Sequence, residues 1–268
     1  MTGISAVVLV LTQVDKIILS KLLPLEYFGY YMLAFTVGGS LMFLVAPVSM
    51  ALFPRLSELV AAGRTDELSQ LYHKGCQIVS LFVFPAGILI LFFPQEILML
   101  WMQDTKIVEH TYLLLSVVIV GCVLSSIVTL PYMLQLAYGW TTLAFYKNII
   151  AIIILIPLLL LLVHYFGVIG GAMAWALLNA GYVLFEIPWM HRRLLRGEMG
   201  RWFFVDVGLP AVCCILWGII LRMYFSRSTT MSMKLTALTI SWVSMFGVCA
   251  LALPFARNYF KKVFYARL

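Results

Sequence analysis

The sequence predicts an all-α polytopic membrane helix bundle with about eight transmembrane helices. Of its 268 residues, 63% are hydrophobic and only 11% are charged, and the mean hydropathy is +1.04. A soluble domain carries about 25% charged residues. The apolar residues also fall into runs of roughly 20, which is the length of an α-helix that crosses the hydrocarbon core of a bilayer.

Eight such runs follow one another along the chain. We expect spans at residues 4–23, 28–53, 69–93, 107–136, 141–165, 168–190, 203–225 and 235–256. The longest connection, residues 54–68, is expected to continue one helix, turn at Gly63 and begin the next helix at Thr65 or Asp66. Neither a soluble domain nor a cleavable signal is expected.

Lysine and arginine lie mostly on one side of these spans. If connections are assigned alternately to two sides, 12 basic residues fall on the side of both termini and 5 on the other, with Lys16 inside the first span. Cytoplasmic segments of membrane proteins are enriched in Lys and Arg. The sequence therefore predicts that both termini are cytoplasmic.

The same distribution argues against nucleic acid as a partner. The net charge is +7, but the basic residues lie between the apolar runs, where they set membrane orientation. The five cysteines lie in or beside apolar runs without metal-ligand spacing. We therefore expect no metal site, no disulfide framework and no cofactor.

The Asp15-Lys16 pair in the first span is the main functional candidate. Charges inside a membrane span cost a few kcal/mol or more and usually mark a substrate or ion pathway. On a helical projection, the polar residues of this span fall within an arc of about 160°: Thr2, Ser5, Thr12, Gln13, Asp15, Lys16 and Ser20. This arc should face other helices or a water-filled lumen. Because sequential residues do not face each other on a helix, Asp15 and Lys16 are expected to have separate partners. The alternative is that both charges pair with polar groups of neighbouring helices and only hold the helices together.

Other polar residues are weaker candidates. Ser125 and Thr129 form a stripe that could line a cavity or mediate ordinary helix packing. Lys147 and Asn148 lie near the end of a span, where a lysine can also snorkel to the headgroups. Glu186 and Asp206 are interpreted as interface anchors, and none of the four histidines is expected to relay protons.

Three segments resemble a known family. They are QVDKIILSKLLPLEYFGYYMLA at residues 13–34, LFPRLS at 52–57 and YFGVIGGA at 165–172. They resemble, in order, the C-terminal half of polysaccharide transporters of the O-antigen flippase (Wzx) type. These flippases share a superfamily with the multidrug-extruding MATE proteins. The resemblance covers roughly residues 1–200.

The resemblance implies a two-lobed bundle of 12 or 14 helices, in which this chain would supply helices 7–14. Residues 1–200 would form the C-terminal six-helix lobe, and residues 201–268 two additional helices with a basic cytoplasmic tail. The N-terminal lobe would be missing, so a truncated or partial transporter is expected. Alternating access requires two halves that rock around a shared site.

The implied function is flipping of polyprenyl-diphosphate-linked glycan across the bacterial inner membrane, and not enzymatic catalysis. Lys16 or Lys147 would suit the diphosphate, and Asp15 would suit coupling to a proton or sodium ion. Further partners would be a missing N-terminal lobe or polysaccharide assembly proteins.

Three alternatives remain open: a MATE-type cation-coupled drug exporter, a non-transporting remnant or assembly subunit, and a membrane-embedded glycosyltransferase. A net negative lumen would favour the drug exporter and a net positive one the flippase. The glycosyltransferase would need a large outer loop or carboxylate motifs on an interfacial loop, whereas no connection here exceeds about twenty residues.

Overall fold

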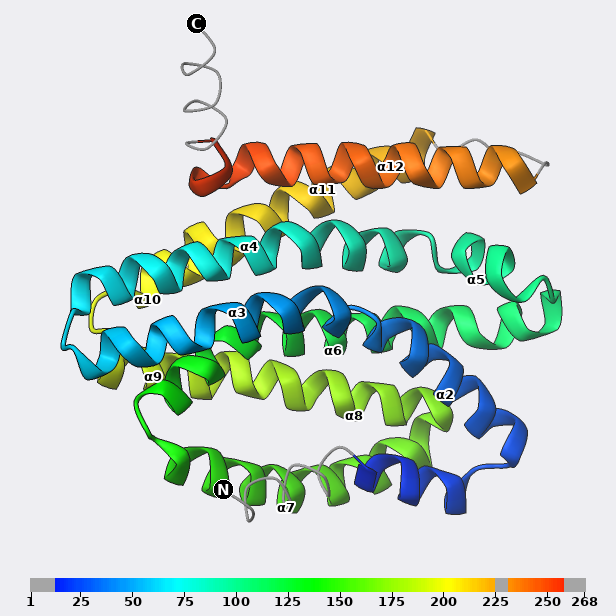
Figure 1. The fold of residues 1–268 in the computed structure, drawn as a ribbon. Coiled ribbons are helices and arrows are strands. Elements are labelled where there is room, and N and C mark those ends of the chain that lie inside the picture. The colour runs from blue at the N-terminus through cyan, green and yellow to red at the C-terminus, as the bar shows by residue number, and fades with distance from the viewer. Residues whose placement is uncertain (1–12, 225–230, 258–268) are drawn as a thin grey trace, which may run out of the picture.

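The computed structural model describes residues 13–224 and 231–257, and these residues form helices and no strand (Figure 1). Residues 13–22 are helical. The helices that follow are α2 (Leu25–Gly39), α3 (Met42–Ala61), α4 (Thr65–Phe92), α5 (Pro94–Met102), α6 (Thr105–Ala137), α7 (Thr141–Phe166), α8 (Val168–Gly181), η1 (Tyr182–Glu186), α9 (Ile187–Leu194), α10 (Met199–Arg201), η2 (Trp202–Gly208), α11 (Leu209–Tyr224) and α12 (Met231–Ala252). The predicted all-α class is confirmed.

Seven helical stretches in the described ranges are long and apolar enough to cross a membrane: Met42–Ala61, Thr65–Phe92, Thr105–Ala137, Thr141–Phe166, Val168–Leu194, Met199–Tyr224 and Ser232–Ala252. They correspond to seven of the eight expected spans. The first expected span, residues 4–23, lies partly outside the described residues.

The expected second span, residues 28–53, is not one helix. The helix breaks at Ser40 and Leu41, between α2 and α3. Two glycines precede the break, and glycine is the poorest helix former after proline. Gly38 also packs closely on α6, since a Cβ there would lie 2.9 Å from Val118 Cγ1. Beyond the break, α3 runs to Ala61.

The connection between α3 and α4 follows the expectation. Gly63 has a φ of +67°, a left-handed conformation that glycine adopts without a steric cost, and α4 begins at Thr65. The next connection differs, because it contains the short helix α5, which was not predicted. Two π-helical segments, η1 and η2, were also not predicted.

α6 is the central helix of the bundle. It packs against α2, α3, α4, α5 and α8, while α7 packs on α8 and both α11 and α12 pack on α4. Figure 1 shows α12 at one edge of the bundle and α7 at the opposite edge. Apolar side chains form two buried clusters, one including Tyr31 and Leu115 and the other including Tyr72 and Trp202.

The helix ends alternate between two sides of the bundle. In Figure 1 the α3–α4 turn, the α6–α7 turn and α9–α10 lie at one end, and α5 and the α7–α8 turn lie at the other. This is the grouping of connections on which the Lys and Arg count depends. The proposed boundary near residue 200 stays a prediction.

Candidate functional site

Asp15 is placed in the bundle by the helix of residues 13–22. Leu19 lies one turn further on the same face and is fully buried. Gly171 of α8 leaves room for it, because a Cβ at Gly171 would lie 2.9 Å from Leu19 Cδ1. Asp15 therefore points into the protein and is only 5% exposed.

Asp15, Lys16, Tyr31 and Phe35 form what we call the Asp15 cluster. The Tyr31 hydroxyl donates a hydrogen bond of 2.7 Å to Asp15 Oδ2. The Lys16 ammonium lies 3.6 Å from Asp15 Oδ1 and 5.4 Å from the centre of the Phe35 ring. The expectation that these sequential residues do not face each other is therefore wrong, whereas Asp15 does have a separate partner in Tyr31.

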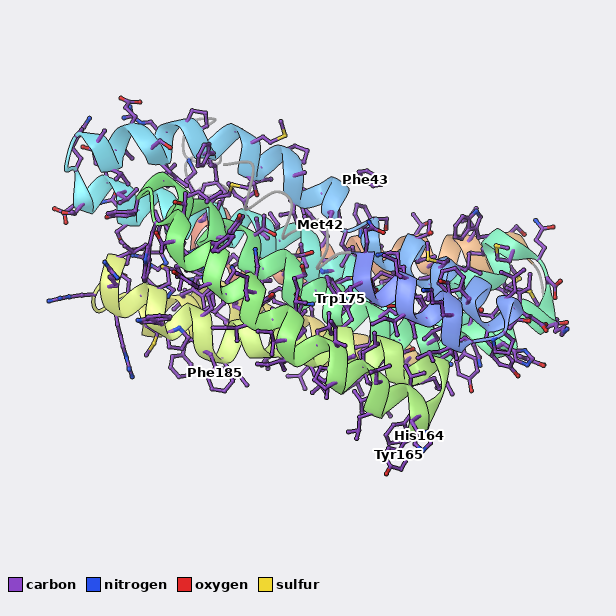
Figure 2. All side chains as sticks on the ribbon, turned by 90° about the horizontal axis from the view of Figure 1, so that it is seen from below. Met42, Phe43, His164, Tyr165, Trp175 and Phe185 are labelled. Carbon is purple, nitrogen blue, oxygen red and sulfur yellow. The ribbon has the colours of Figure 1, made fainter. Side chains whose placement is uncertain are left out.

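The Asp15 cluster borders a cavity of about 320 Å³. Its lining residues are Asp15, Lys16, Phe35, Gly39, Met42, Cys122, Ser125 and Trp175. The cavity therefore adjoins the break between α2 and α3. Figure 2 labels Met42 and Trp175 near the middle of the bundle, whereas His164 and Tyr165 mark one end of α7.

A second polar group, the Glu186 cluster, lies between α6, α7 and η1. The Lys147 ammonium is 2.5 Å from Glu186 Oε1, and the Gln135 amide donates to the same oxygen at 2.7 Å. Lys147 also lies over the rings of Tyr132 and Tyr182, at 4.6 and 5.1 Å from their centres. Glu186 is 6% exposed and the Lys147 side chain 14%, so the carboxylate is buried and the lysine partly buried.

The Glu186 cluster borders a largely apolar cavity of about 370 Å³, which lies between α7 and the continuous helix formed by α8 and η1. Phe185, next to Glu186, lies on the outer edge of the bundle and is 77% exposed (Figure 2).

The interpretation of Glu186 and Asp206 as interface anchors is wrong, because both carboxylates are buried. Each lies in a π-helical segment, η1 or η2. An extra residue in a helical turn changes the direction of the side chains that follow, and such turns are frequent at functional sites. Lys147 is paired inside the bundle and does not snorkel.

The structure separates the candidate residues predicted from the sequence. Ser125 joins Asp15 and Lys16 around the first cavity. Gln13 and Ser20 are exposed, and the Ser20 hydroxyl donates to the Ile17 carbonyl at 2.9 Å.

The remaining candidates have other surroundings. Thr129 donates to the Ser125 carbonyl at 3.1 Å, Asn148 is buried, and Lys147 belongs to the Glu186 cluster. Thr12 lies outside the described residues.

Tyr31, Trp175 and Glu186 were not predicted as site residues. Aromatic side chains in an apolar run give no signal of polar contacts, so Tyr31 and Trp175 could not be recognised. In the described part of the chain, no group of three or more His, Cys, Asp or Glu could hold a metal ion.

The comparisons with known proteins bear on this arrangement. A model of the MatE family matches residues 2–161, which is more than half of the 268 residues. The chain belongs to the MatE family. A comparison with curated proteins finds no match.

The MatE match includes both charges of the Asp15 cluster, Ser125 and Lys147, and it ends within α7. Glu186 and Trp175 lie beyond it. Members of the MatE family are transporters, and with its long apolar helices this chain is a multi-pass membrane protein of that family.

Proposed function

We propose that this MatE protein takes part in flipping a polyprenyl-diphosphate-linked glycan across the bacterial inner membrane for cell-surface polysaccharide synthesis. The proposal rests on which of the two charged side chains in the Asp15 cavity is more accessible, the cation or the anion. The Lys16 side chain is 26% exposed, whereas that of Asp15 is 7% exposed.

This difference favours an anionic substrate over a cationic one. Asp15 is covered by Tyr31 and lies beside the Lys16 ammonium. A cationic drug entering the cavity would meet the ammonium first and be repelled. A diphosphate would gain a charge-assisted hydrogen bond there, the stronger class of hydrogen bond.

The walls of the cavity suit a polar sugar headgroup. Phe35 and Trp175 present large aromatic surfaces, and Ser125 adds a hydroxyl. The polyprenyl tail would remain in the lipid.

Asp15 supports coupling to a proton or a sodium ion. Its Oδ1 has no hydrogen-bond partner in the described ranges and lies 3.6 Å from the Lys16 ammonium. Neutralising Asp15 would remove the countercharge of Lys16, and the ammonium would then hold an anionic headgroup more strongly. Loss of the bound cation would restore the ion pair and favour release.

Alternating access needs two bundles that rock around a shared site. We therefore include a matching N-terminal half among the proposed partners, together with polysaccharide assembly proteins. A cation-coupled drug exporter is the second candidate, because the MatE match covers the segment that carries Asp15.

The test uses bacteria that lack their own flippase and display no surface polysaccharide. The chain is expressed with a matching N-terminal half, and surface polysaccharide is measured per molecule of protein in the membrane. Lys16→Ala should lower this value roughly tenfold, in line with the loss of a hydrogen bond to a charged group. Lys16→Arg should retain most of it, because the cation remains. Lys21→Ala, at an exposed lysine outside the cavity, is the matched control.

Asp15→Asn separates the two candidate functions. For a flippase it should abolish the dependence of glycan export on the ion gradient. If instead Lys16→Ala leaves glycan export unchanged, and Asp15→Asn abolishes efflux of a cationic dye, the exporter is the correct function.

A further inference from the structure

His73 lies between two carboxylates in the interior of the protein. Its Nδ1 contacts Asp206 Oδ2 in a short hydrogen bond, and its Nε2 lies 3.0 Å from Glu198 Oε2. The side chains of His73 and Asp206 are fully buried, whereas that of Glu198 is 32% exposed. We call these three residues the His73 chain. It has one accessible end, Glu198, and one enclosed end, Asp206.

The hydrogen bonds of the His73 chain set its lowest proton count. An ionised carboxylate can only accept hydrogen bonds, and each ring nitrogen needs a proton in order to donate. The two contacts of His73 therefore require at least two protons among the three groups, with a net charge of −1, and a third proton bound from water as the pH falls makes the chain neutral. With only one proton, a nitrogen lone pair would face a carboxylate inside the protein, which is costly.

These two protons can be distributed in three ways. Either Glu198 is a neutral acid and His73 donates only to Asp206, or His73 is doubly protonated between two carboxylates, or Asp206 is the neutral acid. The three forms contain the same atoms and the same total charge. Passing from the first to the third breaks the O–H bond of Glu198 and the Nδ1–H bond of His73, forms the Nε2–H bond of His73 and an O–H bond at Asp206, and moves the negative charge to Glu198.

We propose that the His73 chain is a proton-binding site in which Glu198 exchanges protons with water and Asp206 stores one inside the bundle. His73 carries the proton between them. This site is distinct from the Asp15 cluster and does not depend on the identity of the transported substrate.

The neighbouring residues stabilise the negative charge both when it lies on Glu198 and when it lies on Asp206. Ser69 donates to Glu198 Oε1 at 3.0 Å, and the Arg201 guanidinium lies 3.9 Å from Glu198 Oε2, so negative charge on Glu198 is compensated. The amide of Gln77 donates to Asp206 Oδ1 at 2.8 Å. Among residues 13–224 and 231–257, the other ionisable groups beside the His73 chain are Tyr72 and Cys76 of α4 and His191 of α9.

Gln77 connects the stored proton to the last helices. While its nitrogen donates to Asp206, its carbonyl oxygen accepts from the Phe255 backbone N–H at 2.9 Å, just beyond the end of α12. Neutralising Asp206 would weaken the hydrogen bond from Gln77, because bonds to charged acceptors are the stronger ones. Proton binding would thus loosen the junction of α4, η2 and the chain that follows α12.

The proposal is tested on the purified full-length protein in lipid nanodiscs by infrared difference spectroscopy between about pH 5 and about pH 8. The wild type should show the carbonyl band of a buried carboxylic acid that changes with pH. The band should be absent in Asp206→Asn. It should persist in Asp15→Asn and in Glu58→Gln, a surface carboxylate paired with Arg55, so failure of the Asp15 proposal leaves this result unaffected.

The entry route is tested by transfer into heavy water. Glu198→Gln should slow deuteration of the Asp206 band roughly 100-fold, since a positioned acid–base group typically accelerates proton transfer by about that factor or more. This variant changes a partly exposed residue and gives a result even if Asp206→Asn does not fold. A pH-independent spectrum would show that the His73 chain is a fixed structural contact. Unchanged deuteration in Glu198→Gln would show that the proton enters elsewhere. Either result overturns the proposal.

Discussion

Gly170 illustrates how single residues set the spacing of the helices around the Asp15 cluster. It lies in the first turn of α8, just after the turn at Gly167, where φ is +57°. A Cβ at Gly170 would lie 2.1 Å from the Leu162 carbonyl oxygen of α7. Because that atom belongs to the backbone, α7 and α8 would have to move apart.

Gly170→Ala should therefore destabilise the protein by about 1–3 kcal/mol, the usual cost of overpacking a tight contact. Gly29→Ala is the matched control, since a Cβ at this helical position has nothing within 4 Å. The control should be neutral or slightly stabilising, because alanine favours helices more than glycine does. Both effects are measured by thermal unfolding in the same lipid. Equal stability of the two variants would contradict the proposed close packing.

The residues of the site differ in how far the sequence reveals them. Asp15 and Lys16 could be recognised because charges are costly in an apolar run. Their partners could not, since Tyr31 reaches Asp15 only through the packing of α2. The His73 chain left a weak signal in the spacing of Ser69, His73 and Gln77, four residues apart on one face of α4. Its carboxylates come from a segment more than 100 residues later.

At the level of helices, hydropathy predicts where a span lies but not how it bends. The break between α2 and α3 lies inside one apolar run. Because the residues on both sides of the break are apolar, the hydropathy of the run does not reveal it. The π-helical turns of η1 and η2 are likewise invisible to a helical period of 3.6 residues. Both π segments carry a buried carboxylate, so the features missed by the sequence pattern coincide with polar sites.

The start of α6 allows a test of one helix end. The Asp104 carboxylate accepts hydrogen bonds from the backbone N–H groups of Lys106 and Ile107, at 2.8 and 3.2 Å. Asp104→Ala should cost about 1 kcal/mol by removing this N-cap, whereas Asp104→Asn should retain most of the stability. Hydrogen exchange at the Lys106 and Ile107 amides should rise in the alanine variant only. Unchanged exchange would mean that the cap does not form.

For the whole molecule, the distribution of charge between the two ends determines orientation. The end formed by the α3–α4 turn, the α6–α7 turn and α9–α10 carries most of the basic residues of the described chain. At that end the Arg193 guanidinium carbon lies 4.3 Å from the centre of the Trp140 ring. This arrangement suits the headgroup region, where Trp and basic residues anchor a membrane protein. The opposite end pairs Lys106 with Glu26 and Arg222 with Glu96, so two of its few cations are neutralised.

This asymmetry predicts the position of each end. Reporter domains fused after Arg196 and after Leu268, which lies beyond the described residues, should be active in the cytoplasm. A reporter fused after Thr105 should be active on the outer side, because the positive-inside rule opposes translocation of the basic connections. The Glu198 end of the His73 chain would then exchange protons with the cytoplasm. If the Thr105 reporter is active in the cytoplasm and the Arg196 and Leu268 reporters are active on the outer side, the bundle has the opposite orientation in the membrane. A Leu268 fusion on the side opposite to Arg196 would show that α11 and α12 do not both cross the membrane.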